Sequence, residues 1–326
     1  MNARMKAGIV YAVAAAVIIA SWIGNAAVYR HNQLPEAGFL QHYIEATDNG
    51  GHIELLYLAN RSDPRRIVGV TIEGLPWVKF QASSGGNEMR YQRVEELMAI
   101  IDPRQGQPGE AEEDGPLVIR EVTAHYSDGT SERKNVGEIR LYREAARAES
   151  EDGEGAAGAE NAVVSKDGNT DRIEDGNTGA DTGGNTGTSA GTEAVDRPFS
   201  FGSGGSSSDG AGHGTIAIQR PITWTDVYSA WLPVLGDAFE WQVSADSEQL
   251  ELPADLDAHQ SLTLKYQFRL DDHPAHDMDV FQLIMRMSFR ERNDQIWDYS
   301  VYAAYKPRMT EAQVRAYVQG KRRERA

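Results

Sequence analysis

One loop of this chain concentrates side chains that can bind a metal ion. Residues 271–279 place His273 and His276 three positions apart among four aspartates. Imidazole and carboxylate groups both ligate divalent metals such as zinc or manganese. His273, His276 and Asp277 are therefore candidate metal ligands. No further ligand can be identified elsewhere, and the loop joins two predicted strands, where a polar hairpin tip is expected in any case. We favour the solvated hairpin tip and keep the metal site as the alternative.

Other patterns that resemble binding or catalytic motifs lack the context that would give them meaning. Residues 167–178 begin like a calcium-binding loop, but arginine and threonine stand where glycine and glutamate are required. Residues 153–158 match a dinucleotide-binding pattern by letters, but they follow no predicted strand. Residues 187–191 match the Gly-x-Ser-x-Gly nucleophile elbow by letters only, because no predicted strand precedes them. These absences favour a protein that is not an enzyme.

The first structural element that the sequence predicts is a long apolar segment. Residues 7–28 contain no charged side chain. As a helix they extend roughly 33 Å, enough to cross a hydrocarbon core of about 30 Å. Arg4 and Lys6 precede the segment, whereas Arg30 is the last basic residue on the far side before Arg61. Because basic residues stay in the cytoplasm, residues 1–6 are predicted inside and the rest outside.

A cleaved signal peptide is the alternative to this signal anchor. Gly24-Asn25-Ala26 offers small residues in a cleavage-like pattern before Ala27, which would give a secreted protein. The apolar segment is longer than the usual signal core of roughly 7–15 residues. Trp22 near its outer end also suits a helix that stays in the membrane. We therefore predict a single-pass protein of the cell membrane.

Composition narrows the class of partner. The chain has no cysteine, which excludes disulfides and thiol catalysis. Its formal net charge of −17 argues against nucleic acid, because phosphate binding needs clustered lysine and arginine. The one basic cluster, residues 321–325, is interpreted as a solvated tail. The alternative is contact with anionic lipid or an anionic envelope polymer. The expected partners are the membrane and another envelope protein or such a polymer.

Residues 145–214 differ in composition from the rest of the chain. They hold thirteen acidic against four basic residues, and sixteen of the 32 glycines. Such a segment cannot bury enough apolar surface to offset the entropy lost on ordering. We predict a disordered acidic, glycine-rich linker between two ordered regions.

The first ordered region, residues 35–144, shows the alternation of strands. Ile53, Leu55 and Tyr57 alternate with other residues, and this period of two indicates a strand. Residues 94–101 are ambiguous, because their apolar positions fit a helix as well. The region is predicted to be β-rich.

The second ordered region, residues 215–308, has clearer alternation in three consecutive segments. We expect these strands to pair in sequence order as an antiparallel meander, with Phe268, Met285 and Tyr299 on their apolar faces. Residues 309–326 form a short helix, because Thr310 and Gln313 have the spacing of a capping box. Its last residues are the basic tail.

Together these features predict a mainly β protein. An N-terminal transmembrane helix precedes extracytoplasmic regions that resemble antiparallel β-sandwiches, which are joined by a disordered linker and followed by a short C-terminal helix. The expected function is binding or assembly at the cell envelope, without a cofactor. A metal-dependent envelope enzyme that uses His273 and His276 is the alternative.

Overall fold

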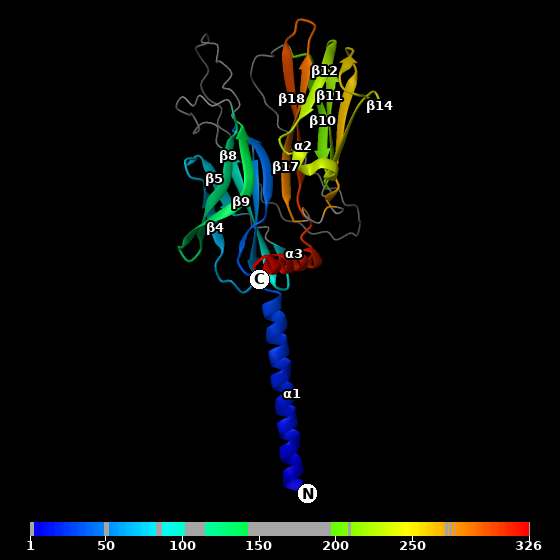
Figure 1. Ribbon diagram of the computed structural model, residues 1–326. Helices are drawn as coiled ribbons and strands as arrows, with labels where there is room; N and C mark the ends of the chain where they lie inside the picture. The colour runs from blue at the N-terminus through cyan, green and yellow to red at the C-terminus, as the bar shows by residue number, and fades with distance from the viewer. Residues whose placement is uncertain are drawn as a thin grey trace, which may run out of the picture.

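The computed structural model describes residues 3–48, 52–82, 87–101, 115–142, 197–207, 210–270, 273, 276 and 278–325. Strands dominate these residues, so the prediction of a mainly β protein is confirmed. One long helix projects from a body of strands, and the body has two lobes (Figure 1). We call residues 37–142 the first lobe and residues 197–305 the second lobe.

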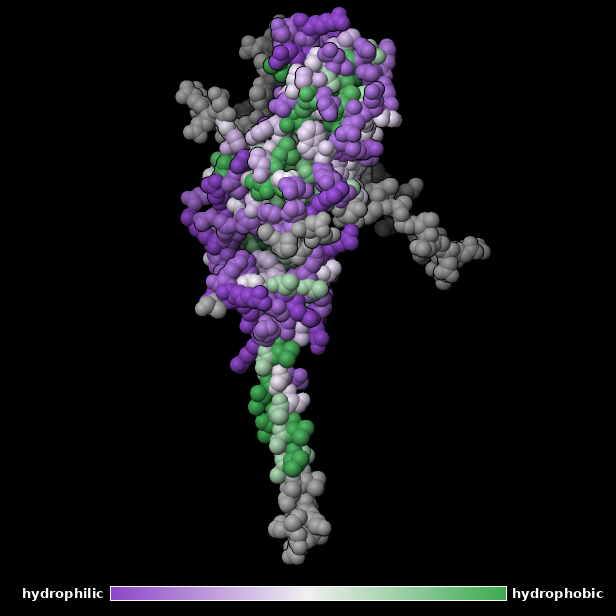
Figure 2. Space-filling model, turned by 45° about the vertical axis from the view of Figure 1, so that its right-hand side comes forward, coloured by the Kyte–Doolittle hydropathy of each residue, from purple (hydrophilic) through white to green (hydrophobic). Residues whose placement is uncertain are grey.

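The projecting helix is α1 (Ala3–His31), which extends beyond the predicted segment at both ends. Its residues from Ala12 to Arg30 are exposed. Residues 12–31 are long and apolar enough to cross a membrane, a property that signal sequences share. Hydrophobic residues cover the described part of this helix, whereas the adjoining body is mostly hydrophilic (Figure 2). An apolar helix that no other element covers is unstable in water and needs lipid or a partner.

The first lobe consists of two facing groups of strands. One is a sheet in the order β1-β3-β7-β5, with β6 also paired to β7: β1 (Gly38–Phe39), β3 (His52–Asn60), β5 (Val78–Ala82), β6 (Asn87–Glu88) and β7 (Gln92–Ile101). The other is part of a larger sheet: β2 (His42–Thr47), β4 (Ile67–Thr71), β8 (Leu117–Tyr126) and β9 (Ser131–Tyr142). Apolar side chains from both groups form a single core between them. The segment with ambiguous periodicity is therefore a strand, β7.

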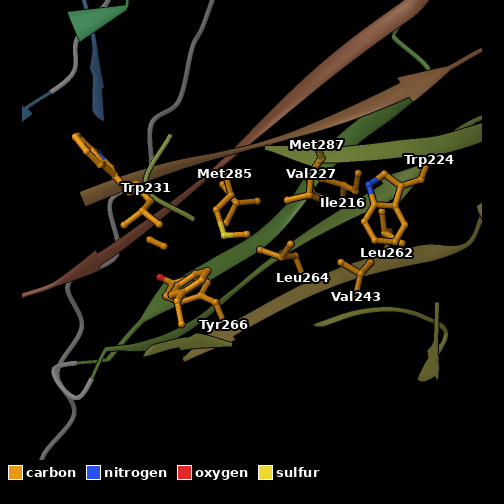
Figure 3. Close-up of a cluster of buried hydrophobic side chains, with 14 of the residues drawn as sticks. Ile216, Trp224, Val227, Trp231, Val243, Leu262, Leu264, Tyr266, Met285 and Met287 are labelled. Carbon is orange, nitrogen blue, oxygen red and sulfur yellow. The ribbon is translucent and has the colours of Figure 1, made fainter. Parts of the chain in front are cut away.

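The second lobe repeats this layered plan. Its outer sheet has the order β10-β11-β16-β13-β14: β10 (Phe199–Ser206), β11 (Ala211–Ile218), β13 (Phe239–Ala245), β14 (Glu248–Gln249) and β16 (Ser261–Phe268). Facing it are β12 (Ile222–Tyr228), β15 (Ala254–Leu256), β17 (Val280–Arg290) and β18 (Ile296–Tyr305). A short helix, α2 (Leu232–Leu235), follows β12. Figure 3 shows Leu264 and Met285 among the buried side chains that the two layers contribute to the core.

The predicted pairing of the last three strands in sequence order is wrong for one of them. β17 and β18 form a hairpin over ten residue pairs, closed by a tight turn in which Asp294 has a φ of 62°. β16 instead pairs with β11 and β13 in the opposite sheet. A tight turn returns the chain beside itself, whereas the longer connection after β16 crosses from one layer to the other. Even so, Phe268 and Met285 are buried in one common core.

The predicted linker extends too far toward the C-terminus. β10 and the start of β11 lie inside the range 145–214 and pair with each other. Phe199 is buried and packs against Phe289 and Tyr299, with ring centroids 5.2 and 5.8 Å apart. This single aromatic side chain brings the strand into the core despite its glycine- and serine-rich sequence. Residues 143–196 lie outside the described part of the chain, and disorder there stays a prediction.

One sheet continues through both lobes. β2 pairs in parallel with β9 of its own lobe and with the first residues of β17, where His42–Ile44 meet Val280–Gln282. The expectation of purely antiparallel sheets is therefore corrected at β2. The lobes keep separate cores but share a continuous backbone hydrogen-bonding network.

The last described element is the predicted helix, α3 (Glu311–Arg325), which lies across the base of the body next to the C-terminal end of α1 (Figure 1). The Thr310 backbone N–H donates to Gln313 Oε1, at 3.1 Å, and the Gln313 N–H donates to Thr310 Oγ1, at 3.3 Å. Val314 and Val318 are buried in a third apolar cluster with Leu56 of β3. α3 therefore covers the outer face of the first lobe.

Candidate functional site at the base of the molecule

The body is attached to α1 by a short, well-bonded segment, residues 29–36. The Leu34 N–H donates to Asn60 Oδ1 at 2.7 Å, and Asn60 Nδ2 donates back to the Leu34 carbonyl at 2.9 Å. Tyr29 in the last turn of α1 meets Tyr91 edge to face, with ring centroids 5.9 Å apart. Contacts on both sides of the helix end hold the direction of α1 relative to the first lobe.

Arg322 of α3 completes this attachment. Its Nε donates to the Gln33 carbonyl at 3.0 Å, and its guanidinium also donates to the Arg30 carbonyl. The last carbonyls of a helix lack partners within the helix and carry partial negative charge. A guanidinium at this position satisfies them and offsets the dipole. The basic end predicted to be a solvated tail is therefore helical through Arg325, and Arg322 serves as a cap for α1.

A groove of about 850 Å³ opens beside this attachment, between the segment that follows α1, the start of β9, the 276–279 loop and α3. We call it the basal groove. Its apolar wall includes Phe39, Tyr43 and Tyr317. Both signs of charge line it, largely in pairs. Lys134 Nζ lies 2.8 Å from Glu36 Oε1, and Lys321 Nζ lies 3.0 Å from Glu324 Oε2.

These pairs set the protonation states in the groove. Hydrogen bonds from Lys134 and Arg325 lower the pKa of Glu36. Burial lowers the pKa of Lys134, but its bonds to Glu36 and Glu132 outweigh burial and leave that pKa above its ordinary value. The groove therefore presents fixed charges of both signs beside aromatic rings.

His276 and Asp279 form the polar pair on one wall. His276 Nδ1 lies 2.7 Å from Asp279 Oδ2. Burial raises the pKa of Asp279, while the hydrogen bond to His276 opposes that rise. The His276 ring also packs edge to face against Tyr43 and Phe281. A histidine held in this way has a fixed ring orientation and can present its Nε2 to a ligand.

Two of the three predicted metal ligands, His273 and His276, lie at this wall. The His276 N–H donates to the His273 carbonyl at 2.9 Å, and His276 itself lines the groove. Asp277 lies outside the described residues. Among the residues that are described, no three His, Cys, Asp or Glu side chains are grouped to hold one metal ion. A site built on His273, His276 and Asp277 therefore stays a prediction.

A second polar centre joins the two lobes above the groove. Glu45 of β2 is fully buried, and its carboxylate accepts four hydrogen bonds. Three come from the second lobe: Ser229 Oγ at 2.5 Å, the Ala230 N–H at 3.1 Å and the Ile284 N–H at 3.0 Å. The fourth comes from the Tyr142 hydroxyl at 2.9 Å. A buried carboxylate is tolerated only with such partners, so this residue couples the lobes.

Aromatic and cationic side chains surround Glu45. Burial, together with the charge of Glu45, raises the pKa of Tyr142 to about 12, so its hydroxyl stays a donor. The Arg286 guanidinium lies 3.7 Å from the centre of the Tyr142 ring, and that of Arg140 lies 4.4 Å from the Trp231 ring. Each of these two contacts crosses from one lobe to the other.

His42 fixes the strand that carries Glu45. Its Nδ1 lies 3.0 Å from the Val136 carbonyl, and its Nε2 lies 2.9 Å from the Leu56 nitrogen. The first is therefore the donor and the second the acceptor in a neutral ring. Burial lowers the pKa of His42 to about 4. Gly137 lies against the same strand with a φ of 95°, and a Cβ there would overlap the His42 backbone. We assign His42 a structural role.

Sequence analysis did not identify Glu45, His42 or the basal groove. One signal was present: Glu45 stands between Ile44 and Ala46 inside a strand, without polar neighbours on either side. The groove has no local signal, because its walls come from distant segments. Arg325 and Glu36, which are bonded to each other, lie 289 positions apart.

No protein-family model and no curated protein matches this chain. Among solved structures, it is similar to a protein of unknown function from Porphyromonas gingivalis W83, at 10% identity over 83% of this chain and 98% of that one, with a TM-score of 0.17. A chicken TCR matches at 7% identity over 82% and 99% of the two chains, with a TM-score of 0.19. The Enterococcus faecalis MSCRAMM ACE matches at 7% identity over 84% and 95%, also with a TM-score of 0.19. These scores are too low to support an argument about fold or function.

Proposed function

We propose that this chain is a single-pass membrane protein with β-sandwich lobes outside the cell, and that it acts by binding or assembly at the cell envelope. The observation that carries the proposal is α1, an exposed apolar helix whose end is capped by Arg322 and bonded to the first lobe. A helix of this kind is stable in a bilayer, where its backbone groups are paired internally. Arg4 and Lys6 favour an N-terminus on the cytoplasmic side.

The anchor is tested by extracting membranes at alkaline pH and measuring the mass of the retained chain. We expect the full-length chain in the pellet, and release of a variant with Ile18→Lys and Ile19→Lys, because charges at mid-span oppose insertion. Protease added to intact protoplasts should digest both lobes. A soluble chain that begins near Ala27 would show signal cleavage, and protection of the lobes would show the opposite orientation.

The basal groove is the part of the body best suited to a partner in the envelope. It combines aromatic walls with charges of both signs, and it opens next to the anchor. A uniform polyanion prefers a uniformly basic surface, whereas this groove pairs Lys134 and Arg325 with Glu36. A mixed lining of this kind suits a segment of another envelope protein.

Photo-cross-linking in cells tests this assignment. A photoreactive phenylalanine replaces Ala316, which lines the groove, or Tyr302, which is exposed on β18 away from it. We expect a discrete adduct with a membrane protein from the first position only, and its loss on Tyr43→Ala. Equal adducts at both positions, or none at the groove, would remove the basis for the assignment.

The alternative is a metal-dependent envelope enzyme, and the observation that favours it is the His276–Asp279 pair on the groove wall. A carboxylate that orients a histidine is a common feature of metal sites. Elemental analysis of the purified chain separates the two functions. One equivalent of zinc or manganese, lost together with thermal stability on adding chelator, would favour the enzyme.

A further inference from the structure

Four arginines gather where α1 meets the body. Arg30 is in the last turn of α1, and Arg90 and Arg315 line a small crevice with Asn32, the residue that follows the helix. Arg323 is exposed on α3. We call these four residues the basal arginines. These residues come from three separate parts of the sequence, so no short stretch of sequence contains the cluster.

The basal arginines carry positive charge that no ion pair among the described residues offsets. None of the four forms an ion pair with a carboxylate in the described part of the chain, whereas the neighbouring acids are engaged. Glu36 pairs with Lys134 and Glu324 with Lys321, while Glu311, which lines the crevice with Arg90 and Arg315, accepts the backbone N–H of Arg90. α3 carries five basic and two acidic residues within a chain of net charge −17. The base is therefore a basic surface on an acidic protein.

α1 determines what this surface meets. Its uncharged segment ends at Val28, two residues before Arg30, so a helix that spans the bilayer places Arg30 roughly 3 Å along its axis beyond the apolar segment. Tyr29 and Trp22 lie along the same end, in the manner of the aromatic residues found at membrane interfaces. Arg30 is then near the lipid phosphates, and Arg90 and Arg315 border Asn32, two residues further along the chain. A planar guanidinium binds phosphate with two parallel hydrogen bonds.

We infer that the basal arginines bind the phosphate groups of anionic lipids in the leaflet from which α1 emerges. The inference rests on the proposed membrane anchor and adds a lipid specificity to it. Each basic residue near an anionic surface changes binding by about fivefold. Lipid bound there would hold α3, and with it the cap on α1, against the membrane surface.

The test uses the full chain inserted in vesicles of one part phosphatidylglycerol to four parts phosphatidylcholine. Spin-labelled lipids report the association constant of phosphatidylglycerol at the protein relative to phosphatidylcholine. We expect a several-fold preference for phosphatidylglycerol that falls toward one in R315Q/R323Q and weakens in high salt. The matched control, R290Q/R292Q, removes the same charge from exposed positions at the β17–β18 turn and should keep the preference.

The possible failures are distinguishable, because insertion is measured separately by flotation at alkaline pH. A wild-type chain that floats but shows no lipid preference, or a control that loses the preference as R315Q/R323Q does, overturns the lipid inference and leaves the anchor intact. A wild-type chain that does not float overturns both.

Discussion

The two lobes share a layered plan, but their outer sheets have different surroundings. β16 of the second lobe alternates between buried and more exposed positions along its length. β3 of the first lobe is buried at every position from Ile53 to Ala59. The difference lies in what covers each strand. α3 and the segment that follows α1 pack on the outer face of β3, where Leu34 and Val318 join Leu58 in the third apolar cluster.

This difference assigns distinct mechanical roles to the lobes. The first lobe has no free face at β3, because α3 and the segment that follows α1 cover that face. The second lobe keeps an exposed outer sheet and is bonded to the first lobe through the Glu45 carboxylate and the continuous sheet. The second lobe is thus joined to α1 by two routes. Glu45 and the β2–β17 pairing lead through the first lobe, whereas the chain after β18 leads to α3, whose Arg322 bonds the end of α1.

The largest expected effect distinguishes the two faces of the second lobe. Phe268→Ala removes a buried ring that packs against Phe239, Phe281 and Tyr305, and should lower the free energy of unfolding by about 3–5 kcal/mol. Gln267→Ala on the opposite face should change it by less than about 0.5 kcal/mol. Denaturant melts of the two variants measure both values. Equal effects would mean that the outer sheet is covered as in the first lobe.

In the first lobe, substitutions on the two faces of the outer sheet should have similar effects on stability. Leu55 lies in the inner core and Leu58 on the outer face of β3, yet both are buried. We expect Leu55→Ala and Leu58→Ala each to lower the free energy of unfolding by about 2–5 kcal/mol. Arg315→Ala on the exposed side of α3 is the control, with a change under about 0.5 kcal/mol. A negligible effect of Leu58→Ala would show that α3 does not cover β3 in solution.

A smaller effect is the loss of folding stability at low pH, which arises from His42 in the first lobe. Histidine in an unfolded chain has a pKa of about 6.5, and burial lowers the pKa of His42 to about 4. Between these values the unfolded chain binds more protons, so stability falls as pH decreases from about 6.5 to 4. The loss reaches about 3 kcal/mol, and no more of it occurs at lower pH.

Urea melts at pH 7 and pH 4.5 measure this loss. His213→Gln, at an exposed position on β11 of the second lobe, is the matched control for the loss of an imidazole. His42→Gln should remove most of the difference while lowering stability at pH 7. Glu54, whose pKa burial raises to about 7, changes stability in the opposite sense over this range, so the deciding comparison is between the two chains. A His42→Gln variant with the same pH dependence as the wild type would mean that His42 is accessible to protons in the folded state.

The contrast between strands with one buried face and strands buried on both faces explains how much of the fold was predictable. Alternation identified β16, β17 and β18 and the buried faces of Phe268 and Met285, because each strand has one face in a core. It left β7 ambiguous, because Leu97 faces the first core while Val94 faces the third cluster. Pairing was predicted only where a tight turn fixed it. The layer to which β16 belongs depends on contacts with β11 and β13 that no local signal encodes.

The candidate site was less predictable than the fold. The sequence pointed to His276, which does line the basal groove, but from the aspartates around it the prediction selected Asp277, whereas the carboxylate bonded to His276 is that of Asp279. The basic tail was interpreted as solvated, because sequence alone cannot show that Arg322 meets the carbonyls of α1. Glu45 was overlooked because its four donors come from three distant segments. Sites assembled by long-range contacts leave little trace in local composition.

The smallest expected effect concerns the segment between the lobes. Because β10 starts at Phe199, the dispensable part of the predicted linker must end before that residue. Deleting residues 150–190 leaves about 15 residues to connect β9 to β10, roughly a fourfold shortening of the connection. Closing a shorter loop costs less entropy, by about 0.6 kcal/mol per halving, so the free energy of unfolding should rise by about 1 kcal/mol or less. Thermal melts of the two chains, with the His42-dependent pH profile as a check on the fold, measure the change. A loss of several kcal/mol would mean that the acidic segment packs on the lobes, which would contradict the prediction that it is a disordered tether.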